Sequence, residues 1–294
     1  MRISCFFVIG MSAVAASVSA AERTVLIVAG QSNVLNWHAD AAKLPASEAD
    51  REIAFYFHTG APPSKAGAMM TPFNATSGGA WVTLRAQRQE PYVRYAREFF
   101  GPEISLARAL QRAGTPRLAI VKVGYFGSTL AEDWRPDATK GNRLYALMCE
   151  QVATALQALR ASGDTPRVAG FFWMQGETDG AKEEHAAGYE QALRAFIARV
   201  RKDFGGDGAR GSGVSAVGAP LLPVILGRVG PPPARGYAYQ ERVRQAQVRV
   251  AEAGERILWV DTDDQPRDTD GVHMLAEGVI TLGERWAEAW LKLK

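Results

Sequence analysis

Short apolar runs alternate along this chain with longer segments in which apolar residues recur at helical spacing. The runs predict strands over 24–29, 53–57, 117–123, 168–174, 221–227 and 257–261, and the longer segments predict helices over 104–113, 142–162, 183–203, 238–253 and 275–291. Pro102 before one helix, and Gly114 and Gly163 after two others, fit the usual residues at helix ends. This alternation predicts an α/β fold, a mostly parallel sheet with helices on both faces.

The first 20 residues differ in composition from the rest of the chain. Arg2 precedes an apolar stretch, and the segment ends in small residues at 18–20. We expect a signal peptide at 1–20 that is cleaved near Ala20, so that the mature chain is secreted or periplasmic. Residues 21–294 are expected to form a single domain. They contain no apolar run long enough to span a bilayer, so we expect no association with a membrane.

The charge of the chain bears on its partners, and its cysteine content on the state of its one remaining thiol. The chain has 34 Lys and Arg against 31 Asp and Glu, a formal net charge of +3, with no basic block. A nucleic acid or an anionic membrane is therefore not an expected partner. Loss of the signal peptide removes Cys5 and leaves Cys149 alone, which we interpret as a buried helical thiol. Nothing in the sequence indicates the oligomeric state.

Four polar or glycine-rich segments follow expected strands. They are 30–33, 124–134, 175–179 and the loop around Asp270. Because ligands bind beyond the carboxyl ends of parallel strands, we expect these segments to share one rim of the sheet. Residues 40–100 fit the alternation poorly, and we interpret them as an insertion that walls a substrate cleft.

Two of these segments carry the residues of a serine hydrolase. Ser32 ends the first strand in Gly30-Gln31-Ser32-Asn33, and Asp270 lies three residues before His273. A serine hydroxyl becomes a nucleophile when a histidine takes its proton and a carboxylate orients that histidine. Each part has an alternative, a serine that caps a helix and a surface turn with an incidental histidine. The other histidines have no carboxylate at a matching spacing: His38, His58 and His185.

The other two segments offer groups for an oxyanion hole. Gln175 ends a hydrophobic strand, and its amide supplies N–H groups without a charge to neutralise. Gly127 can bring a backbone N–H close to the same point. Aromatic residues on the expected rim fit either the stacking of sugar rings or core packing. They are Trp37, Trp81, Tyr125 and Trp134.

Taken in order, these motifs resemble the SGNH hydrolase superfamily, and within it the branch of sialate O-acetylesterases and acetylxylan esterases. The resemblance is carried by Gly-Gln-Ser-Asn at 30–33, the Gly127 loop, Trp-x-Gln-Gly-Glu-x-Asp at 173–179 and the terminal Asp-x-x-His. It implies a three-layer α/β/α sandwich with a flavodoxin-like sheet. It also implies a secreted esterase that removes O-acetyl groups from a carbohydrate through an acyl-serine intermediate.

The resemblance assigns a role to each site residue. Ser32 would be the nucleophile, His273 the general base and Asp270 the residue that orients it. The backbone N–H groups of Ser32 and Gly127 and the side-chain amide of Gln175 would form the oxyanion hole. Two other functions remain as alternatives, a carbohydrate-binding protein on an esterase scaffold and an esterase for acyl esters that contain no sugar.

The chain departs from the superfamily pattern in two places. Gln175-Gly176-Glu177 stands where the superfamily usually has Gly-x-Asn-Asp, as in the esterase branch. In that branch the glutamate also helps to hold the histidine, so Glu177 competes with Asp270 for the orienting role. Phe126 precedes Gly127 where relatives often have a glycine, and it would narrow the cleft.

Motifs for cofactors and metals are weak or absent. Gly206–Gly211 matches the dinucleotide fingerprint in letters, but it follows an expected helix and no helix opens after it. Residues 261–264 begin like a calcium loop and lack its glycine and closing glutamate. The sequence has no zinc motif and no Gly-x-Ser-x-Gly elbow. We therefore expect no cofactor and no metal, and an acetylated carbohydrate as the partner.

Overall fold

The computed structural model describes residues 21–65, 75–88, 98–206 and 220–294. The expected signal peptide at 1–20 and nearly all of the glycine-rich motif at 206–211 lie outside these ranges. Among the described residues, no helix combines the length and apolarity needed to cross a bilayer.

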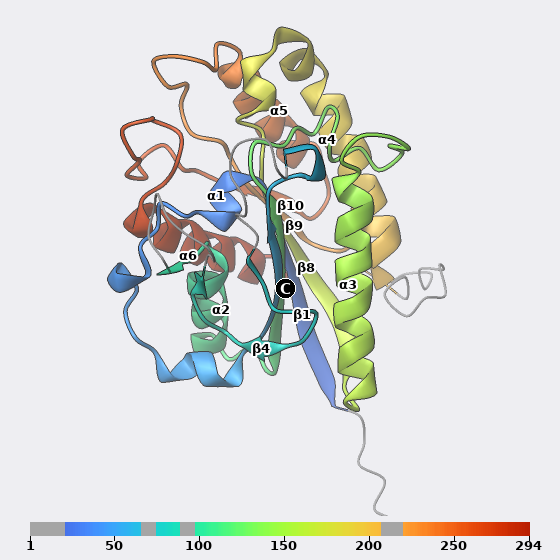
Figure 1. Cartoon of the computed structure of the whole chain (residues 1–294). Helices are drawn as coiled ribbons and strands as arrows, with labels where there is room; N and C mark the ends of the chain where they lie inside the picture. The colour runs from blue at the N-terminus through green and yellow to red at the C-terminus, as the bar shows by residue number, and fades with distance from the viewer. Residues whose placement is uncertain (1–20, 66–74, 89–97, 207–219) are drawn as a thin grey trace, which may run out of the picture.

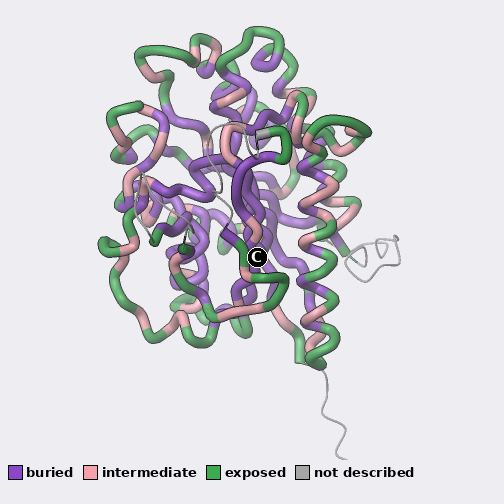
Figure 2. The backbone as a smooth tube through the Cα atoms, viewed as in Figure 1, coloured by how far each residue is buried: buried purple, intermediate pink, exposed green. Residues whose placement is uncertain are grey.

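The first strand lies at the centre of the sheet (Figure 1). β1 (Glu22–Gly30) is buried from Thr24 onward, and it pairs in parallel with β7 (Leu118–Tyr125) on one side and with β8 (Thr165–Met174) on the other. Its residues are apolar on both faces, so both faces need cover, as in the interior of a parallel sheet. Figure 2 shows this centre as a continuous buried core.

The strand order places the end of β1 at a topological switch point. β9 (Val224–Gly227) and β10 (Ile257–Val260) continue the sheet in parallel beyond β8. The order β7-β1-β8-β9-β10 is flavodoxin-like, as the resemblance implies. From β1 the chain first forms the strands on the β7 side of the sheet and then crosses to β8 on the other side. In open α/β sheets, ligands bind beyond the carboxyl ends of the strands at such a point.

The expected insertion at 40–100 contributes to the sheet as well as to its surroundings. β2 (Ala54–Gly60) pairs in parallel with β7 at the sheet edge, and β3 (Ala75–Thr76) and β4 (Val82–Thr83) pair with β2 in the antiparallel sense. A separate pair is formed by β5 (Gln87–Arg88) and β6 (Glu98–Phe99).

Helices cover both faces of the sheet, so that the molecule has three layers (Figure 1). α2 (Glu103–Arg112) and α6 (Ala276–Leu291) pack together on one face, and α3 (Leu144–Ala161), α4 (Glu183–Phe204) and α5 (Gln240–Glu252) lie on the other. Shorter turns are α1 (Ser32–Leu35) and the 3-10 helices Ala41–Lys43, Glu48–Glu52, Pro63–Lys65 and Asp179–Ala181. The predicted fold class is confirmed.

The expected elements agree with the observed ones to within a few residues. One difference is β9, which begins at Val224 rather than at 221, because Pro223 has no N–H for the ladder. Cys149 lies half-buried in α3, and burial raises the pKa of its thiol to about 11. Little thiolate therefore forms at neutral pH, consistent with an inert helical thiol.

A buried ion pair ties α2 to the sheet. Nζ of Lys122, in β7, lies 2.9 Å from a carboxylate oxygen of Glu103, at the start of α2, and both side chains are fully buried. Gln87 completes a closed triangle, since its oxygen accepts from Lys122 at 2.9 Å and its amide donates to Glu103 at 2.8 Å. Burial lowers the pKa of Lys122, and the carboxylate of Glu103 opposes that shift.

The substitution Lys122→Met should be strongly destabilising. It leaves the Glu103 carboxylate buried without its cation, which costs about 3–5 kcal/mol of unfolding free energy in comparable buried pairs. Urea denaturation measures the effect. Adding Glu103→Gln should restore part of the lost stability, and a single variant as stable as the wild type would contradict the assigned role of the pair.

Candidate active site

β1 ends in a turn that requires glycine. Gly30 has a φ of 150°, and a Cβ at this position would lie 1.9 Å from the carbonyl oxygen of Met174 in β8. α1 begins directly after it, with Gln31 as the N-cap and Ser32 as the first helical residue. The hydroxyl of Ser32 makes no hydrogen bond within the described part of the chain, so the alternative of a helix-capping serine is not what the structure shows.

Asn33 joins the segment of Ser32 to the segment of His273. Its side-chain amide donates to the carbonyl of Val272 at 3.1 Å, and its side-chain oxygen accepts the N–H of Met274 at 3.0 Å. The two contacts lie on either side of His273 in the chain. Asn33 is buried, so these bonds form away from water and fix the two segments against each other.

Asp270 orients the ring of His273. Its Oδ2 lies 2.6 Å from Nδ1 of His273, and its Oδ1 accepts the backbone N–H groups of Val272 and His273 at 2.8 and 2.9 Å. Burial acts in the opposite sense, but these hydrogen bonds hold the pKa of Asp270 below its usual value. An ionised carboxylate only accepts hydrogen bonds, so Nδ1 carries the proton and Nε2 is left as the acceptor.

No hydrogen bond joins the Ser32 hydroxyl to the imidazole among the described residues. Catalytic hydrogen bonds of this kind are often long in proteins without substrate and tighten in the complex. The structure therefore brings the segment of Ser32 to that of Asp270 and His273 through the hydrogen bonds of the Asn33 side chain to the backbone of Val272 and Met274.

Glu177, the rival for the orienting role, contacts Asn33 instead of the imidazole. Its Oε1 accepts the amide of Asn33 at 2.6 Å, and its Oε2 is buried with no hydrogen-bond partner in the described ranges. Burial raises the pKa of Glu177 even though the bond from Asn33 opposes the shift. In this geometry Asp270 binds the imidazole of His273, and Glu177 binds the side chain of Asn33.

The expectation that Gln175 supplies an oxyanion donor needs correction. Nε2 of Gln175 lies within hydrogen-bond distance of three protein acceptors: Asp179 at 2.6 Å, Ser128 O at 3.1 Å and Gln31 Oε1 at 3.2 Å. An amide has two N–H groups, so none is left over for a substrate. Gln175 is fully buried, and its own oxygen accepts from Tyr189.

Gln175 instead holds the loop that follows β7. Its partner Asp179 accepts the backbone N–H groups of Leu130 and Ala131, in that loop, at 2.9 and 3.0 Å. Gly127 lies at the start of the same loop with a φ of 57°, in the left-handed region that favours glycine. The network therefore fixes the backbone around Gly127 relative to the end of β8.

The four rim aromatics are mostly packed into the interior. Trp134 and Tyr125 are 0 % and 3 % exposed, and Trp134 packs edge-on against Trp173. Trp81 donates its indole N–H to a carbonyl of α3, and Trp37, 7 % exposed, packs edge-on against Phe126. Core packing, rather than an exposed platform for sugars, is what the structure shows.

Local residue spacing did not predict the acidic partner of His38. Its Nδ1 lies 2.6 Å from Oδ2 of Asp268, and its ring stacks on that of His273 with centroids 4.4 Å apart and planes 6° apart. His38 and Asp268 are 230 positions apart, so no local spacing could predict their contact. The only available signal was the second aspartate, two residues before Asp270 in the same loop.

His38, Asp270 and His273 also have ligand atoms within 4.8 Å of one another, close enough to hold a metal ion. Both Nδ1 atoms, however, already face carboxylates. The lone pair of an imidazole nitrogen lies in the ring plane, and these planes are parallel and stacked, so one ion cannot lie in both. The arrangement fits a pair of carboxylate-bound imidazoles better than a metal centre.

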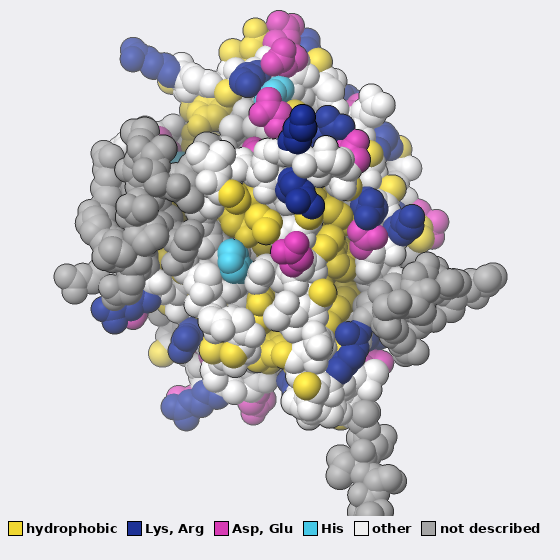
Figure 3. Space-filling model, turned by 45° about the vertical axis from the view of Figure 1, so that its right-hand side comes forward, with side chains coloured by type: hydrophobic (Ala, Val, Ile, Leu, Met, Phe, Trp, Pro, Cys, Tyr) yellow, Lys and Arg dark blue, Asp and Glu magenta, His cyan; other side chains and the backbone are white. Residues whose placement is uncertain are grey.

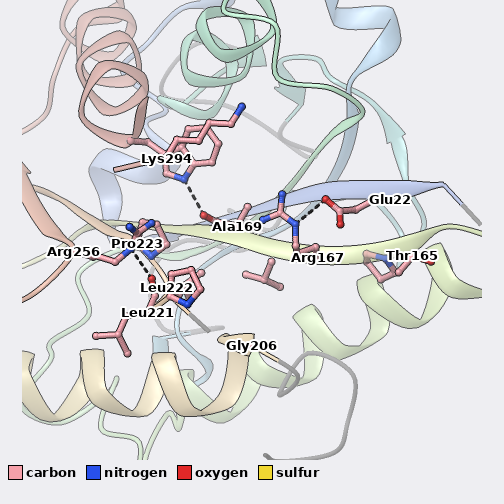
Figure 4. Close-up of a pocket in the computed structure, with 14 residues that line it drawn as sticks. Glu22, Thr165, Arg167, Ala169, Gly206, Leu221, Leu222, Pro223, Arg256 and Lys294 are labelled. Atoms are coloured by element: carbon pink, nitrogen blue, oxygen red, sulfur yellow. Dashed lines mark hydrogen bonds and ion pairs between the residues drawn. The ribbon is translucent and has the colours of Figure 1, made fainter. Parts of the chain in front are cut away.

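A hollow of about 380 Å³ opens at the amino ends of β1 and β8 (Figure 4). Glu22 and Thr165, which line it, begin β1 and β8, whereas Ser32 follows the other end of β1. Two of its arginines have partners within the hollow, since Arg167 donates to Glu22 and Arg256 donates to the carbonyl of Leu221. On the face drawn in Figure 3, cationic side chains are interspersed with acidic ones, in line with the small net charge.

Comparison with known proteins identifies the family. Residues 22–292 match the family model described as carbohydrate esterase, sialic acid-specific acetylesterase. The chain belongs to this family. A probable carbohydrate esterase of Arabidopsis thaliana is 24 % identical to this chain over 193 residues, 65 % of the chain. That match spans 63 % of the plant protein, less than two thirds of its length.

Solved structures share the fold of this carbohydrate esterase family member. A protein from Arabidopsis thaliana has a TM-score of 0.61 at 20 % identity, covering 92 % of this chain and 98 % of that one. A carbohydrate acetylesterase from Xanthomonas citri has a TM-score of 0.59 at 19 % identity, covering 90 % and 55 %. The resemblance to the SGNH carbohydrate esterases is thus confirmed at the level of family and fold.

Burial of Glu177 should make the stability of this protein depend on pH. The pKa of Glu177 in the folded chain is raised above its ordinary value of 4.5. The contribution of Glu177 to the free energy of unfolding is therefore complete below pH 4.5 and is lost as the pH rises through the raised pKa. Glu177→Gln carries no such charge. The difference in Tm between this variant and the wild type should therefore shift in favour of the variant between pH 4.5 and pH 8.

The exposed Glu252 offers a matched control, because Glu252→Gln removes the same charge from the surface. Its Tm difference from the wild type should change little over the same pH range. Equal pH trends for the two variants would contradict a raised pKa at Glu177.

Proposed function

We propose that this chain is a serine esterase that removes O-acetyl groups from a carbohydrate through an acyl-serine intermediate. The observation that carries the proposal is the pair of hydrogen bonds from Asn33 to the residues on either side of His273, since they hold the nucleophile segment against an imidazole whose Nδ1 is bound to Asp270. A serine hydrolase needs this order of groups: hydroxyl, imidazole and carboxylate.

In the proposed mechanism, Nε2 of His273 takes the proton of the Ser32 hydroxyl as Oγ attacks the ester carbonyl. The tetrahedral intermediate collapses, the imidazolium returns its proton to the leaving sugar oxygen, and the acetyl group remains on Ser32. Water then attacks the acyl-serine with His273 again as the base, which releases acetate and restores the hydroxyl. Asp270 stays ionised and stabilises the imidazolium in both steps.

The proposed oxyanion hole uses backbone N–H groups. Ser32 lies in the first turn of α1, where N–H groups have no partner within the helix, and Gly127 follows β7, the strand next to β1. Gln175 and Asp179 support this hole by holding the loop of Gly127 in place. We therefore assign the side-chain amide of Gln175 to the support of the oxyanion hole rather than to the hole itself.

Two parts of the proposal depend on the family and the sequence rather than on site geometry. The choice of a carbohydrate substrate is supported by the family and by the Xanthomonas citri acetylesterase fold, not by the buried aromatics. Export is supported by the composition of residues 1–20, and cleavage near Ala20 would leave β1 intact from Glu22. The mass of the protein recovered from the periplasm or the medium tests the cleavage position.

Ser32→Ala should abolish the release of acetate from acetyl esters, with a loss in kcat of at least roughly 10³-fold, because no acyl-enzyme forms without the hydroxyl. Acetate release from 4-nitrophenyl acetate, acetylated xylans and O-acetylated sialic acids provides the measurement. Ser162→Ala, at the end of α3, is a matched control that should keep full activity.

Unchanged turnover in the Ser32→Ala protein would overturn the nucleophile assignment. Saturable binding of these glycans by the wild type without any acetate release would favour the carbohydrate-binding alternative. Faster turnover of longer acyl esters than of acetyl esters would favour a substrate that is not an acetylated sugar.

Asp270→Asn should reduce kcat on the order of 10³ to 10⁴-fold, because an amide at this position no longer fixes the imidazole tautomer or stabilises the imidazolium. Glu177→Gln should cost much less, since its oxygen can still accept from Asn33. Steady-state kinetics on an acetyl ester compares the two. A larger loss in the Glu177 variant would return the orienting role to that residue.

A further inference from the structure

The pair of His38 and Asp268 lies directly against the pair of His273 and Asp270. The side chain of His38 is 5 % exposed, and its Nδ1 lies 2.6 Å from Asp268, as that of His273 does from Asp270. The two rings are nearly parallel, with planes 6° apart and centroids 4.4 Å apart. A buried, oriented imidazole stacked on the catalytic base has no part in the mechanism above.

The backbone on both sides is built to keep this arrangement. Asn36 ends α1 in the left-handed conformation, with a φ of 56°, and its amide donates to the carbonyl of Met274 at 2.9 Å. This turn carries the chain from α1 to His38. On the other side, the N–H of Asp268 donates to the carbonyl of His273 at 2.8 Å, which sets Asp268 across the loop from His273.

We propose that His38, held by Asp268, is a positioning residue for His273. The inference rests on the proposed function, in which Nε2 of His273 must face the hydroxyl of Ser32. The flat ring of His38 occupies the space on one face of the His273 ring, so rotation of that ring out of its plane would produce a clash. Asp270 fixes one edge of the catalytic imidazole, and His38 fixes its plane.

The charges around His38 suit this role. Burial and the neighbouring His273 lower the pKa of His38, while Asp268 and Asp270 act in the opposite sense. His38 is therefore neutral at neutral pH, where it stacks on His273 without opposing the positive charge that His273 acquires during catalysis. Two imidazolium rings at this distance would repel each other, and a neutral His38 avoids that repulsion.

Three variants separate positioning from general stability. His38→Ala removes the ring, and kcat on an acetyl ester should fall on the order of 10-fold with KM within about 2-fold, because a looser base is misplaced in the transition state. His38→Phe keeps a flat ring and should recover most of the lost kcat. His58, a partly buried histidine that contacts Tyr125 at 3.0 Å, gives the control His58→Ala, whose kcat should remain near that of the wild type.

A measurement without turnover keeps the inference separate from the proposed function. In the Ser32→Ala protein labelled with ¹⁵N-histidine, the Nδ1 proton of His273 should give a sharp resonance that persists with His38→Phe and broadens with His38→Ala. Ser32→Ala retaining full activity would overturn the proposed function but not this result. Unchanged kcat and an unchanged resonance in His38→Ala, or equal losses in the Ala and Phe variants, would overturn the positioning role.

Discussion

The hydrogen bonds of one buried side chain, Asn33, determine whether the site exists. Its two N–H groups and its carbonyl oxygen bind Glu177, Val272 and Met274, two of them 239 and 241 positions further along the chain. Leaving any of these groups unpaired in a buried position would cost the full desolvation of that group. The docking of the last loop and α6 against the first strand, and with it the distance between the proposed nucleophile and base, therefore depends on this amide.

The carboxyl groups near Asn33 occupy different environments and hence differ in charge. Asp270 accepts three hydrogen bonds, including two from backbone N–H groups, and stays ionised beside the imidazole. One oxygen of Glu177 accepts the amide of Asn33, while the other is buried without a hydrogen-bond partner in the described part of the chain, so burial favours the neutral form. Placing acids in contrasting surroundings is how proteins separate the roles of chemically similar groups. Here the contrast leaves the carboxylate of Asp270 charged where it faces Nδ1 of His273.

Local patterns in the sequence predicted the features that residues close together in the chain determine. Apolar runs predicted where the strands lie, and the three-residue spacing predicted the bond between Asp270 and His273. Contacts between distant segments followed no such pattern. The pair of His38 and Asp268 and the enclosure of Gln175 by Asp179 and Ser128 depend on which loops meet at the rim. Residue type alone also could not separate a buried tryptophan such as Trp134 from one that binds a sugar.

The absence of a side chain at Gly30 limits how proteins with this site can diversify. The backbones of β1 and β8 approach so closely there that even a methyl group would collide with the carbonyl of Met174. This close approach fixes the spacing of the two strands at the end that leads into Ser32. Under the proposed function, new substrate preferences would come from the loops, above all the segment after β7 and the insertion around β2, while β1 and β8 keep their spacing.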